Sequence, residues 1–165
     1  MKMYTGKVSV NSAIVIGLGN IGMLYDYNSP KQITTHCRAI ELHPEFELSG
    51  GVDINEKNLR LFEKKYNKPT YNNIENAIGE LQPDLIVISN PTDQHYTTLK
   101  KIFSHYSPKI ILMEKPVSSN YKESIDILNI SKERSIPVAV NYFRQFEKTH
   151  KEISNKILNG EIGFP

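Results

Sequence analysis

The chain alternates between short apolar runs and longer segments in which apolar residues recur at helical spacing. The apolar runs predict six β-strands, at residues 13–17, 46–53, 69–71, 84–89, 109–114 and 136–143. Runs without any polar residue, such as IILM at 110–113, are typical of strands buried on both faces of a sheet. The helical segments lie mostly between these runs, at 34–43, 56–66, 72–81, 94–105, 121–134 and 145–158. Strands that alternate with helices predict an α/β fold, a doubly wound parallel sheet of about six strands with right-handed crossovers.

Polar residues and a glycine predict where several of these helices begin and end. Four residues stand just before helical segments and are expected to cap or open them: Asn55, Asn72, Asp93 and Asn120. Side-chain oxygens of such residues accept hydrogen bonds from free N–H groups of the first helical turn. Gly160 follows the last segment and is a natural C′ residue.

Composition is that of one globular domain and excludes several classes of protein. The chain has 165 residues, 39% of them apolar, and 20 Lys plus Arg against 18 Asp plus Glu. This balance gives no electrostatic case for nucleic acid or for an anionic membrane as a partner. No apolar run reaches the roughly 18 residues of a membrane-spanning helix, and the polar N-terminus MKMYTGKVSVNS does not resemble a signal peptide.

The cysteine and histidine content argues against a metal site. The single cysteine, Cys37, excludes an internal disulfide and a Cys-rich zinc site, and it fits a reducing cytoplasm. The five histidines show no metal-ligand spacing. His36 stands beside Cys37, but without further ligands the pair predicts neither a metal site nor a nucleophile.

The first strand ends in a glycine motif that predicts a dinucleotide site. Ligands of parallel α/β sheets bind beyond the carboxyl ends of the strands, and GLGNIG at 17–22 fits the G-x-G-x-x-G pattern of Rossmann-type folds. Gly17 permits the tight turn, Gly19 lets the backbone approach a pyrophosphate, and Gly22 lets the next helix pack closely. Asn20 and Ile21 complete the turn, whose N–H groups would face the phosphates. The alternative is a glycine-rich turn without a ligand.

Asp53 stands at the end of the second strand, where a carboxylate accepts hydrogen bonds from the adenosine ribose and repels a 2′-phosphate. The next three residues, 54–56, supply no Lys or Arg to bind that phosphate. The cofactor expected is therefore NAD rather than NADP. The alternative is that Asp53 only caps the following helix.

The spacing between these two features departs from the usual pattern. Asp53 follows Gly22 by 31 residues, where about 20 is usual. The excess is YDYNSPKQITTH at 25–36, in which Asn28, Ser29 and Pro30 are expected to break the first helix. Two interpretations fit, a loop that lines the ligand cleft and a plain surface insertion.

The fourth and fifth strand ends also carry polar residues. Ser89, Asn90 and Pro91 follow the fourth strand, and His95 is expected in the first turn of the next helix. A histidine there would be neutral and able to share a hydrogen bond with a ligand, or else it would serve the capping region only. The fifth strand runs into Glu114 and Lys115, two charges that are costly near an interior unless they are paired or used.

Taken in order, four features resemble the Gfo/Idh/MocA family of glucose–fructose oxidoreductase and inositol dehydrogenase-like enzymes. They are GLGNIG, then VD at 52–53, then NPTDQH at 90–95, and then EKP at 114–116. VNYFRQF at 140–146, which contains Asn141 and Arg144, resembles the family's sixth-strand segment. NGEIGFP at 159–165 resembles the family's connection into a second domain.

The resemblance implies a set of roles. Lys115 would be catalytic and reach both the nicotinamide and the reacting hydroxyl, Glu114 would orient it, and the Lys115–Pro116 bond would often be cis. Arg144 would contact the substrate. The cofactor would lie on the glycine turn and on the strand-end residues Asp53, Ser89, Asn90, Pro91, His95, Glu114, Lys115 and Asn141. The alternative for EKP is a surface ion pair at a strand end.

The resemblance also implies how the chain is divided. Residues 1–143 would form the NAD-binding Rossmann domain, and 144–165 would be a junction helix leading to an α/β substrate domain that this chain lacks. The longer protein would transfer a hydride to or from a sugar, a polyol or a sugar derivative, and the open junction could pair with a second copy. A stand-alone dinucleotide-binding module is the main alternative. A site for S-adenosylmethionine would leave EKP and His95 unexplained.

Overall fold

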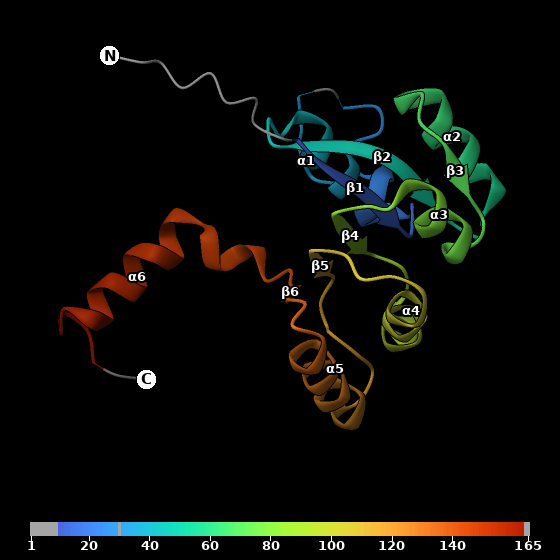
Figure 1. Cartoon of the computed structure of the whole chain (residues 1–165). Helices are drawn as coiled ribbons and strands as arrows, with labels where there is room; N and C mark the ends of the chain where they lie inside the picture. The colour runs from blue at the N-terminus through green and yellow to red at the C-terminus, as the bar shows by residue number, and fades with distance from the viewer. Residues whose placement is uncertain (1–9, 30, 164–165) are drawn as a thin grey trace, which may run out of the picture.

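Six parallel strands form one sheet in the order β3-β2-β1-β4-β5-β6, which confirms the predicted doubly wound α/β fold (Figure 1). The structure is a computed structural model and describes residues 10–29 and 31–163. The strands are β1 (Asn11–Ile16), β2 (Phe46–Val52), β3 (Thr70–Tyr71), β4 (Leu85–Ile88), β5 (Ile110–Met113) and β6 (Val138–Val140). The order reverses between β1 and β4, and ligands of such sheets bind outside the carboxyl ends of the strands at this switch point.

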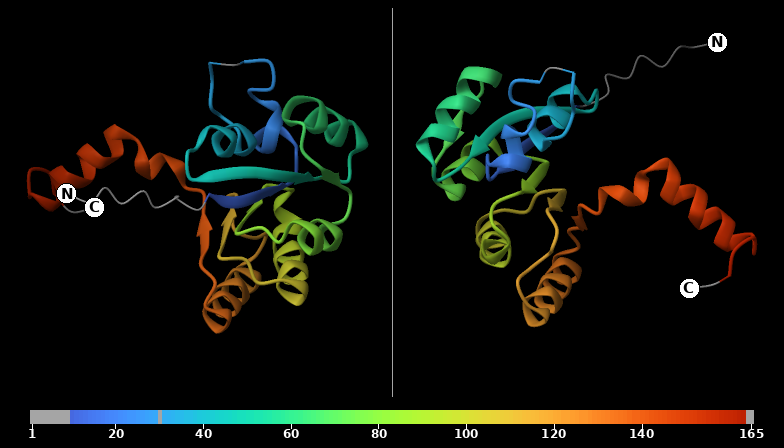
Figure 2. Two further views of the ribbon diagram at one scale, coloured as in Figure 1. Left: turned by 45° about the horizontal axis from the view of Figure 1, so that its top comes forward. Right: turned by 180° about the vertical axis from the view of Figure 1, so that it is seen from behind.

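Helices cover both faces of the sheet. They are η1 (Asn20–Leu24), α1 (His36–Leu42), α2 (Glu56–Tyr66), α3 (Ile74–Leu81), α4 (Thr92–His105), α5 (Tyr121–Arg134), η2 (Phe143–Phe146) and α6 (Lys148–Leu158). Figure 2 shows η1, α1 and α2 on one face and α3, α4 and α5 on the other. This arrangement explains why β4 and β5, with the sequences LIVI and IILM, consist only of apolar residues.

Successive residues of the central strands supply two separate cores. In β1, Ala13 and Val15 pack with the cluster under α1 and α2, while Ile14 and Ile16 pack with the cluster under α3, α4 and α5. Side chains of a strand alternate between faces, so each central strand stabilises both layers. Burying one side chain such as Val15 or Ile14 contributes about 1.5–3 kcal/mol, so both cores stabilise the strands whose carboxyl ends form the candidate site.

Of the four predicted helix starts, two agree with the structure and two differ. Asn55 and Asn120 cap α2 and α5 through their side chains, as predicted. In α3 the cap is Asn73, which accepts from the Asn76 N–H, rather than Asn72. In α4 the helix begins at Thr92 after Pro91 without a side-chain cap, so Asp93 lies in the first turn instead of opening the helix.

The C-terminal part of the chain departs most from the prediction. The strand expected over 136–143 spans only Val138–Val140 because Phe143–Phe146 form a turn of 3₁₀-helix. Figure 1 shows η2 and α6 leading away from the sheet, with Tyr142, Phe143 and Phe146 exposed. Gly160 has φ of 72° and ends α6 as the predicted C′ residue. The last two residues of the predicted connection, 164–165, lie outside the described residues.

Among the described residues, no helix is both long enough and apolar enough to cross a membrane. The same part of the chain contains no group of three or more His, Cys, Asp or Glu residues that could hold a metal ion.

Candidate functional site

The glycine turn after β1 is shaped by two close backbone contacts and one open position. Gly17 has φ of +92°, and a Cβ there would overlap the main chain of Asn90. A Cβ at Gly22 would overlap the Gly17 carbonyl oxygen, whereas a Cβ at Gly19 would meet no atom within 4 Å. Gly17 and Gly22 are therefore required by the fold, and Gly19 leaves space where a ligand can approach the backbone.

The helix after this turn is shorter than predicted. It is a single π-helical turn over Asn20–Leu24, in which the N–H groups of Met23 and Leu24 both donate to the Gly19 carbonyl. The expected break at 28–30 therefore comes after the helix has already ended, and Pro30 itself lies outside the described residues. So short a helix has little dipole, which leaves the turn's own N–H groups as the donors available to a phosphate.

A cavity of about 800 Å³ opens at the carboxyl ends of β1, β2 and β4. Six of the predicted cofactor residues line it: Gly17, Gly19, Asp53, Ser89, Asn90 and Pro91. Ligand sites of proteins have volumes of about 300–1,000 Å³, so the cavity can hold a large part of a dinucleotide. The other predicted residues do not line it: Asn20, Ile21, Gly22, His95, Glu114, Lys115, Asn141 and Arg144.

Asp53 joins the end of β2 to the glycine turn. Its Oδ2 accepts hydrogen bonds from the Leu18 N–H at 2.8 Å and from Asn58 Nδ2 at 3.0 Å. Its Oδ1 accepts from the Asn55 N–H at 2.8 Å. Each carboxylate oxygen has two lone pairs, so Oδ1 keeps one for a further donor. Asp53 thus orders the start of α2 and the glycine turn while it stays on the cavity wall.

Ser89 and Asn90 form the opposite wall at the end of β4. The Ser89 hydroxyl donates to the Gly17 carbonyl at 2.8 Å, and Asn90 Nδ2 donates to Thr98 Oγ1 at 2.8 Å. Asn90 Oδ1 is buried and has no hydrogen-bond partner among the described residues. A buried acceptor without a donor is unfavourable, so this oxygen and the open position at Gly19 fit a polar ligand in the cavity.

His95 lies in the first turn of α4, as predicted, but its ring faces the protein interior. The residue is 1% exposed. Its Nδ1 lies 3.0 Å from the Pro116 carbonyl oxygen, and its Nε2 lies 2.9 Å from the Asn90 carbonyl oxygen. Both ring nitrogens lie within hydrogen-bond distance of main-chain carbonyl oxygens, of which a neutral imidazole can donate to only one, and the ring links the segments that follow β4 and β5. The predicted hydrogen bond from His95 to a ligand stays a prediction.

A second polar cluster lies at the ends of β5 and β6 and is centred on Glu114, which is 9% exposed. Glu114 Oε1 accepts from His36 Nε2 at 2.7 Å and from Asn141 Nδ2 at 2.6 Å. Burial alone would raise the pKa of this carboxyl, but the hydrogen bonds from His36 and Asn141 outweigh burial and lower the pKa. Sequence reasoning missed His36. The available signal was a buried strand-end carboxylate that required donors from elsewhere in the chain.

Lys115 is exposed, and no ion pair or hydrogen bond engages its ammonium among the described residues. Glu114 Oε2 accepts from the Lys115 main-chain N–H at 3.3 Å. Glu114 therefore contacts Lys115 through the main chain, and the prediction that Glu114 orients Lys115 stays a prediction. The Lys115–Pro116 bond is cis, as the resemblance implied. Arg144 is exposed on η2.

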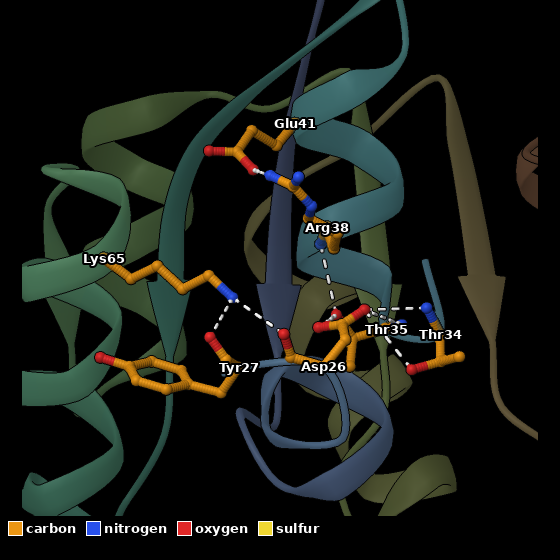
Figure 3. Close-up of polar contacts among 7 residues, drawn as sticks. All are labelled: Asp26, Tyr27, Thr34, Thr35, Arg38, Glu41 and Lys65. Carbon is orange, nitrogen blue, oxygen red and sulfur yellow. Dashed lines mark hydrogen bonds and ion pairs between the residues drawn. The ribbon is translucent and has the colours of Figure 1, made fainter. Parts of the chain in front are cut away.

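The inserted segment before α1 is anchored at both ends (Figure 3). The Asp26 carboxylate accepts from the Thr34 N–H at 2.8 Å, the Thr35 N–H at 3.0 Å and the Thr35 hydroxyl at 2.7 Å. Lys65 of α2 donates to the Tyr27 carbonyl at 3.0 Å and lies over the Tyr27 ring. None of the described residues of 25–35 lines the cavity, which argues against a loop along this cavity. Residues 31–34 are exposed, so the segment fits the alternative of a surface insertion, here one that is tied to α1 and α2.

Comparison with known proteins places the chain among oxidoreductases. A family model described as an oxidoreductase family with an NAD-binding Rossmann fold matches residues 12–142. Myo-inositol 2-dehydrogenase of Thermotoga maritima is 24% identical over 152 residues, which are 92% of this chain and 42% of that protein. The uncharacterized oxidoreductase YrbE of Bacillus subtilis is 25% identical over 152 residues, which are 92% of this chain and 41% of that protein.

Solved structures share the fold at low sequence identity. The WlbA dehydrogenase of Bordetella pertussis, in complex with NADH and UDP-GlcNAcA, has a TM-score of 0.80 at 16% identity and covers 94% of this chain and 41% of its own. Scyllo-inositol dehydrogenase of Lactobacillus casei, with bound NAD(H) and scyllo-inositol, has a TM-score of 0.76 at 14% identity. The match covers 94% of this chain and 43% of that protein. The chain spans about two fifths of the length of these proteins.

Proposed function

The chain belongs to the Gfo/Idh/MocA family of oxidoreductases with an NAD-binding Rossmann fold, and we propose that it binds NAD in the cavity between β1, β2 and β4. The observation that carries this proposal is that the open position at Gly19 and Asn90, whose Oδ1 is buried without a partner among the described residues, both line this cavity. The pyrophosphate would lie against the main chain of the glycine turn, and the adenosine ribose would donate to Asp53.

The preference proposed is for NAD over NADP. A 2′-phosphate would meet the Asp53 carboxylate, and the one lysine that lines the cavity, Lys101, already pairs with Glu75 at 2.9 Å. Calorimetric titration of the chain with both cofactors tests the preference. We expect NAD to bind at least about tenfold more tightly, a difference of about 1.4 kcal/mol. Equal or tighter binding of NADP would contradict the assignment of Asp53.

We further propose that the chain is the nucleotide half of an oxidoreductase that acts on a hydroxyl of a sugar, a polyol or a sugar derivative. NAD, when bound, supplies the hydride chemistry. The unpaired Lys115 ammonium is proposed to exchange the proton of the reacting hydroxyl, and Arg144 is proposed to contact the substrate. A substrate panel on the protein extended by its C-terminal domain, followed by nicotinamide absorbance, tests this reaction.

The division of the chain is part of the same proposal. Residues 1–143 would form the NAD domain, and 144–165 would lead to a substrate domain, for which the exposed Tyr142, Phe143 and Phe146 offer an apolar contact surface. A second copy of the chain is the other occupant proposed for this surface. Cys37 is free and buried, which fits the reducing cytoplasm proposed as the compartment.

A second candidate is a binding module without catalysis, and the observation that favours it is that the two residues proposed to meet the substrate, Lys115 and Arg144, lie outside the cavity. Hydride transfer needs a covered site in which the reacting carbons are held about 3–3.5 Å apart. Lys115 and Arg144 are both exposed here. We therefore expect the 165-residue chain to bind NAD and to form no NADH with any sugar or polyol. NADH formation by the purified chain would contradict this expectation.

A further inference from the structure

We propose that His36 is a positioning residue for Lys115, acting through Glu114, and that the inserted segment 25–35 exists to hold His36 in place. The role assigned to Lys115 rests on the proposed function, but the contacts that link His36 to Glu114 and Glu114 to Lys115 do not depend on it. His36 does not line the cavity, and its ring meets the Glu114 carboxylate from a segment 78 residues away in sequence.

The first step is the anchoring of Lys115. Its N–H donates to Glu114 Oε2 at 3.3 Å, and the carbonyl of the next residue, Pro116, lies 3.0 Å from His95 Nδ1. The main chain is thus held on both sides of the lysine, while the lysine side chain remains exposed. A side chain that extends from a fixed backbone samples a smaller region, which lowers the cost of placing its ammonium against a substrate.

The second step is the anchoring of Glu114. Its carboxylate is nine-tenths buried and ionised, so it can only accept hydrogen bonds. The donors on Oε1 are His36 Nε2 from the start of α1 and Asn141 Nδ2 from the end of β6. His36 Nε2 must therefore carry a proton. Loss of either donor leaves a buried charge short of a partner, which is strongly unfavourable.

The third step is the anchoring of His36. It is the first residue of α1, directly after Thr35, whose hydroxyl caps the helix by accepting from the Arg38 N–H. The Thr35 hydroxyl and N–H both donate to Asp26, which is 1% exposed (Figure 3). Lys65 fixes the main chain at Asp26 and Tyr27 from α2. These contacts set the helix start, and with it the position of the imidazole.

His36 does not act on a ligand itself. The residue is 9% exposed, its Nε2 is occupied by Glu114, and it does not line the cavity. A change at His36 should therefore disturb Lys115 without disturbing the binding of NAD, which separates this role from a general loss of structure.

The test compares His36→Leu with His36→Gln, because glutamine can place an N–H₂ group where the imidazole Nε2 lies and leucine cannot. His43→Gln is the control, since His43 is exposed just beyond the other end of α1. Amide hydrogen exchange of Lys115 is followed by NMR on the 165-residue chain, and NAD affinity is measured on the same samples. The Leu variant should exchange Lys115 about tenfold faster, equivalent to about 1.4 kcal/mol. The Gln variant and the control should stay within about threefold of the original chain.

Two results would overturn the proposal. One is an unchanged Lys115 exchange rate in the Leu variant, and the other is a Gln variant that behaves like the Leu variant. If the Leu variant does not fold, ¹⁵N NMR of the unsubstituted chain tests the proposal by showing whether His36 Nε2 carries a proton. The proposal requires that proton, and an unprotonated Nε2 would exclude it. If no sample binds NAD, the proposed function fails while the exchange and ¹⁵N data still judge the role of His36.

Discussion

Replacing Asp26 with asparagine removes a buried negative charge on which the start of α1 depends. The carboxylate is 1% exposed and accepts three short hydrogen bonds, from the Thr34 N–H, the Thr35 N–H and the Thr35 hydroxyl, at 2.7–3.0 Å. A longer one comes from the Thr34 hydroxyl at 3.5 Å. Asparagine has almost the same shape, so packing is kept. Asparagine is neutral, however, and its side-chain NH₂ group would take the place of one carboxylate oxygen. That group is a donor, and it would face the Thr34 and Thr35 groups, which are donors as well (Figure 3).

The size of the effect follows from those three bonds. A hydrogen bond to a charged group contributes about 1.5–3 kcal/mol and a neutral one about 0.5–1.5 kcal/mol. A loss of about 1 kcal/mol in each of three bonds lowers the free energy of unfolding by about 3 kcal/mol. For a chain of this length that is a fall in Tm of about 6–12 °C. Urea denaturation at neutral pH measures it, with Glu41→Gln as the control. Glu41 forms an exposed ion pair with Arg38, and its loss should cost under about 1 kcal/mol.

The pH dependence gives a second check. Burial would raise the pKa of Asp26, but the bonds from Thr34 and Thr35 outweigh burial and lower the pKa below its usual 3.8. A group with a lowered folded pKa stabilises the protein fully above its unfolded value and loses that contribution as the pH falls through the folded value. The difference in the free energy of unfolding between the original chain and Asp26→Asn should therefore become smaller below about pH 4. Two results would refute the reasoning. One is that Asp26→Asn lowers the free energy of unfolding by less than about 1 kcal/mol at neutral pH, and the other is that the difference between the two proteins stays the same in acid.

Two further predictions concern the lysine and a helix cap. Lys115→Ala, made in the protein extended by its C-terminal domain, should lower kcat by about 10²–10⁴-fold in a nicotinamide absorbance assay. Tm should change little because Lys115 is exposed, and near-normal turnover would remove Lys115 from the proposed mechanism. Asn73→Ala should lower the free energy of unfolding by about 1 kcal/mol in urea denaturation because Asn73 caps α3. Asn72→Ala should stay within about 0.5 kcal/mol, and the reverse order of these two effects would restore the cap originally predicted.

Patterns confined to neighbouring residues predicted most of the fold. The strands were predictable because residues such as Ile14 and Val15 are buried on opposite faces, which makes the apolar runs continuous. Which of Asn72 and Asn73 caps α3 was not predictable in this way, because the answer depends on which helix start lets Ala77 and Ile78 reach the core. The end of β6 was overestimated for a related reason, since β6 pairs only with β5 and apolar residues continue past it into the exposed η2.

The candidate site divides in the same way. The glycine turn and Asp53 follow from local spacing, and the structure brings both to one cavity. The contact between His36 and Glu114 joins residues 78 apart, and the Asp26 contacts proposed to hold His36 in place lie within the inserted segment. Sequence spacing contains no signal for such a contact. His95 shows the converse: its position in the first turn was predictable, but its ring lies between the carbonyl groups of Asn90 and Pro116, the second of which is 21 residues away.

The central claim is that NAD lies against the glycine turn, and titration of Gly19→Val with NAD tests it most directly. Gly19 has φ of −73° and faces open space, so valine should leave Tm without ligand unchanged while it fills the place proposed for the pyrophosphate. Gly79→Ala, on an exposed position of α3 with similar open space, is the control. We predict that the original chain and the control bind NAD and that Gly19→Val binds at least about tenfold more weakly, by about 1.4 kcal/mol. A folded Gly19→Val chain that binds NAD as tightly as the original would contradict the claim.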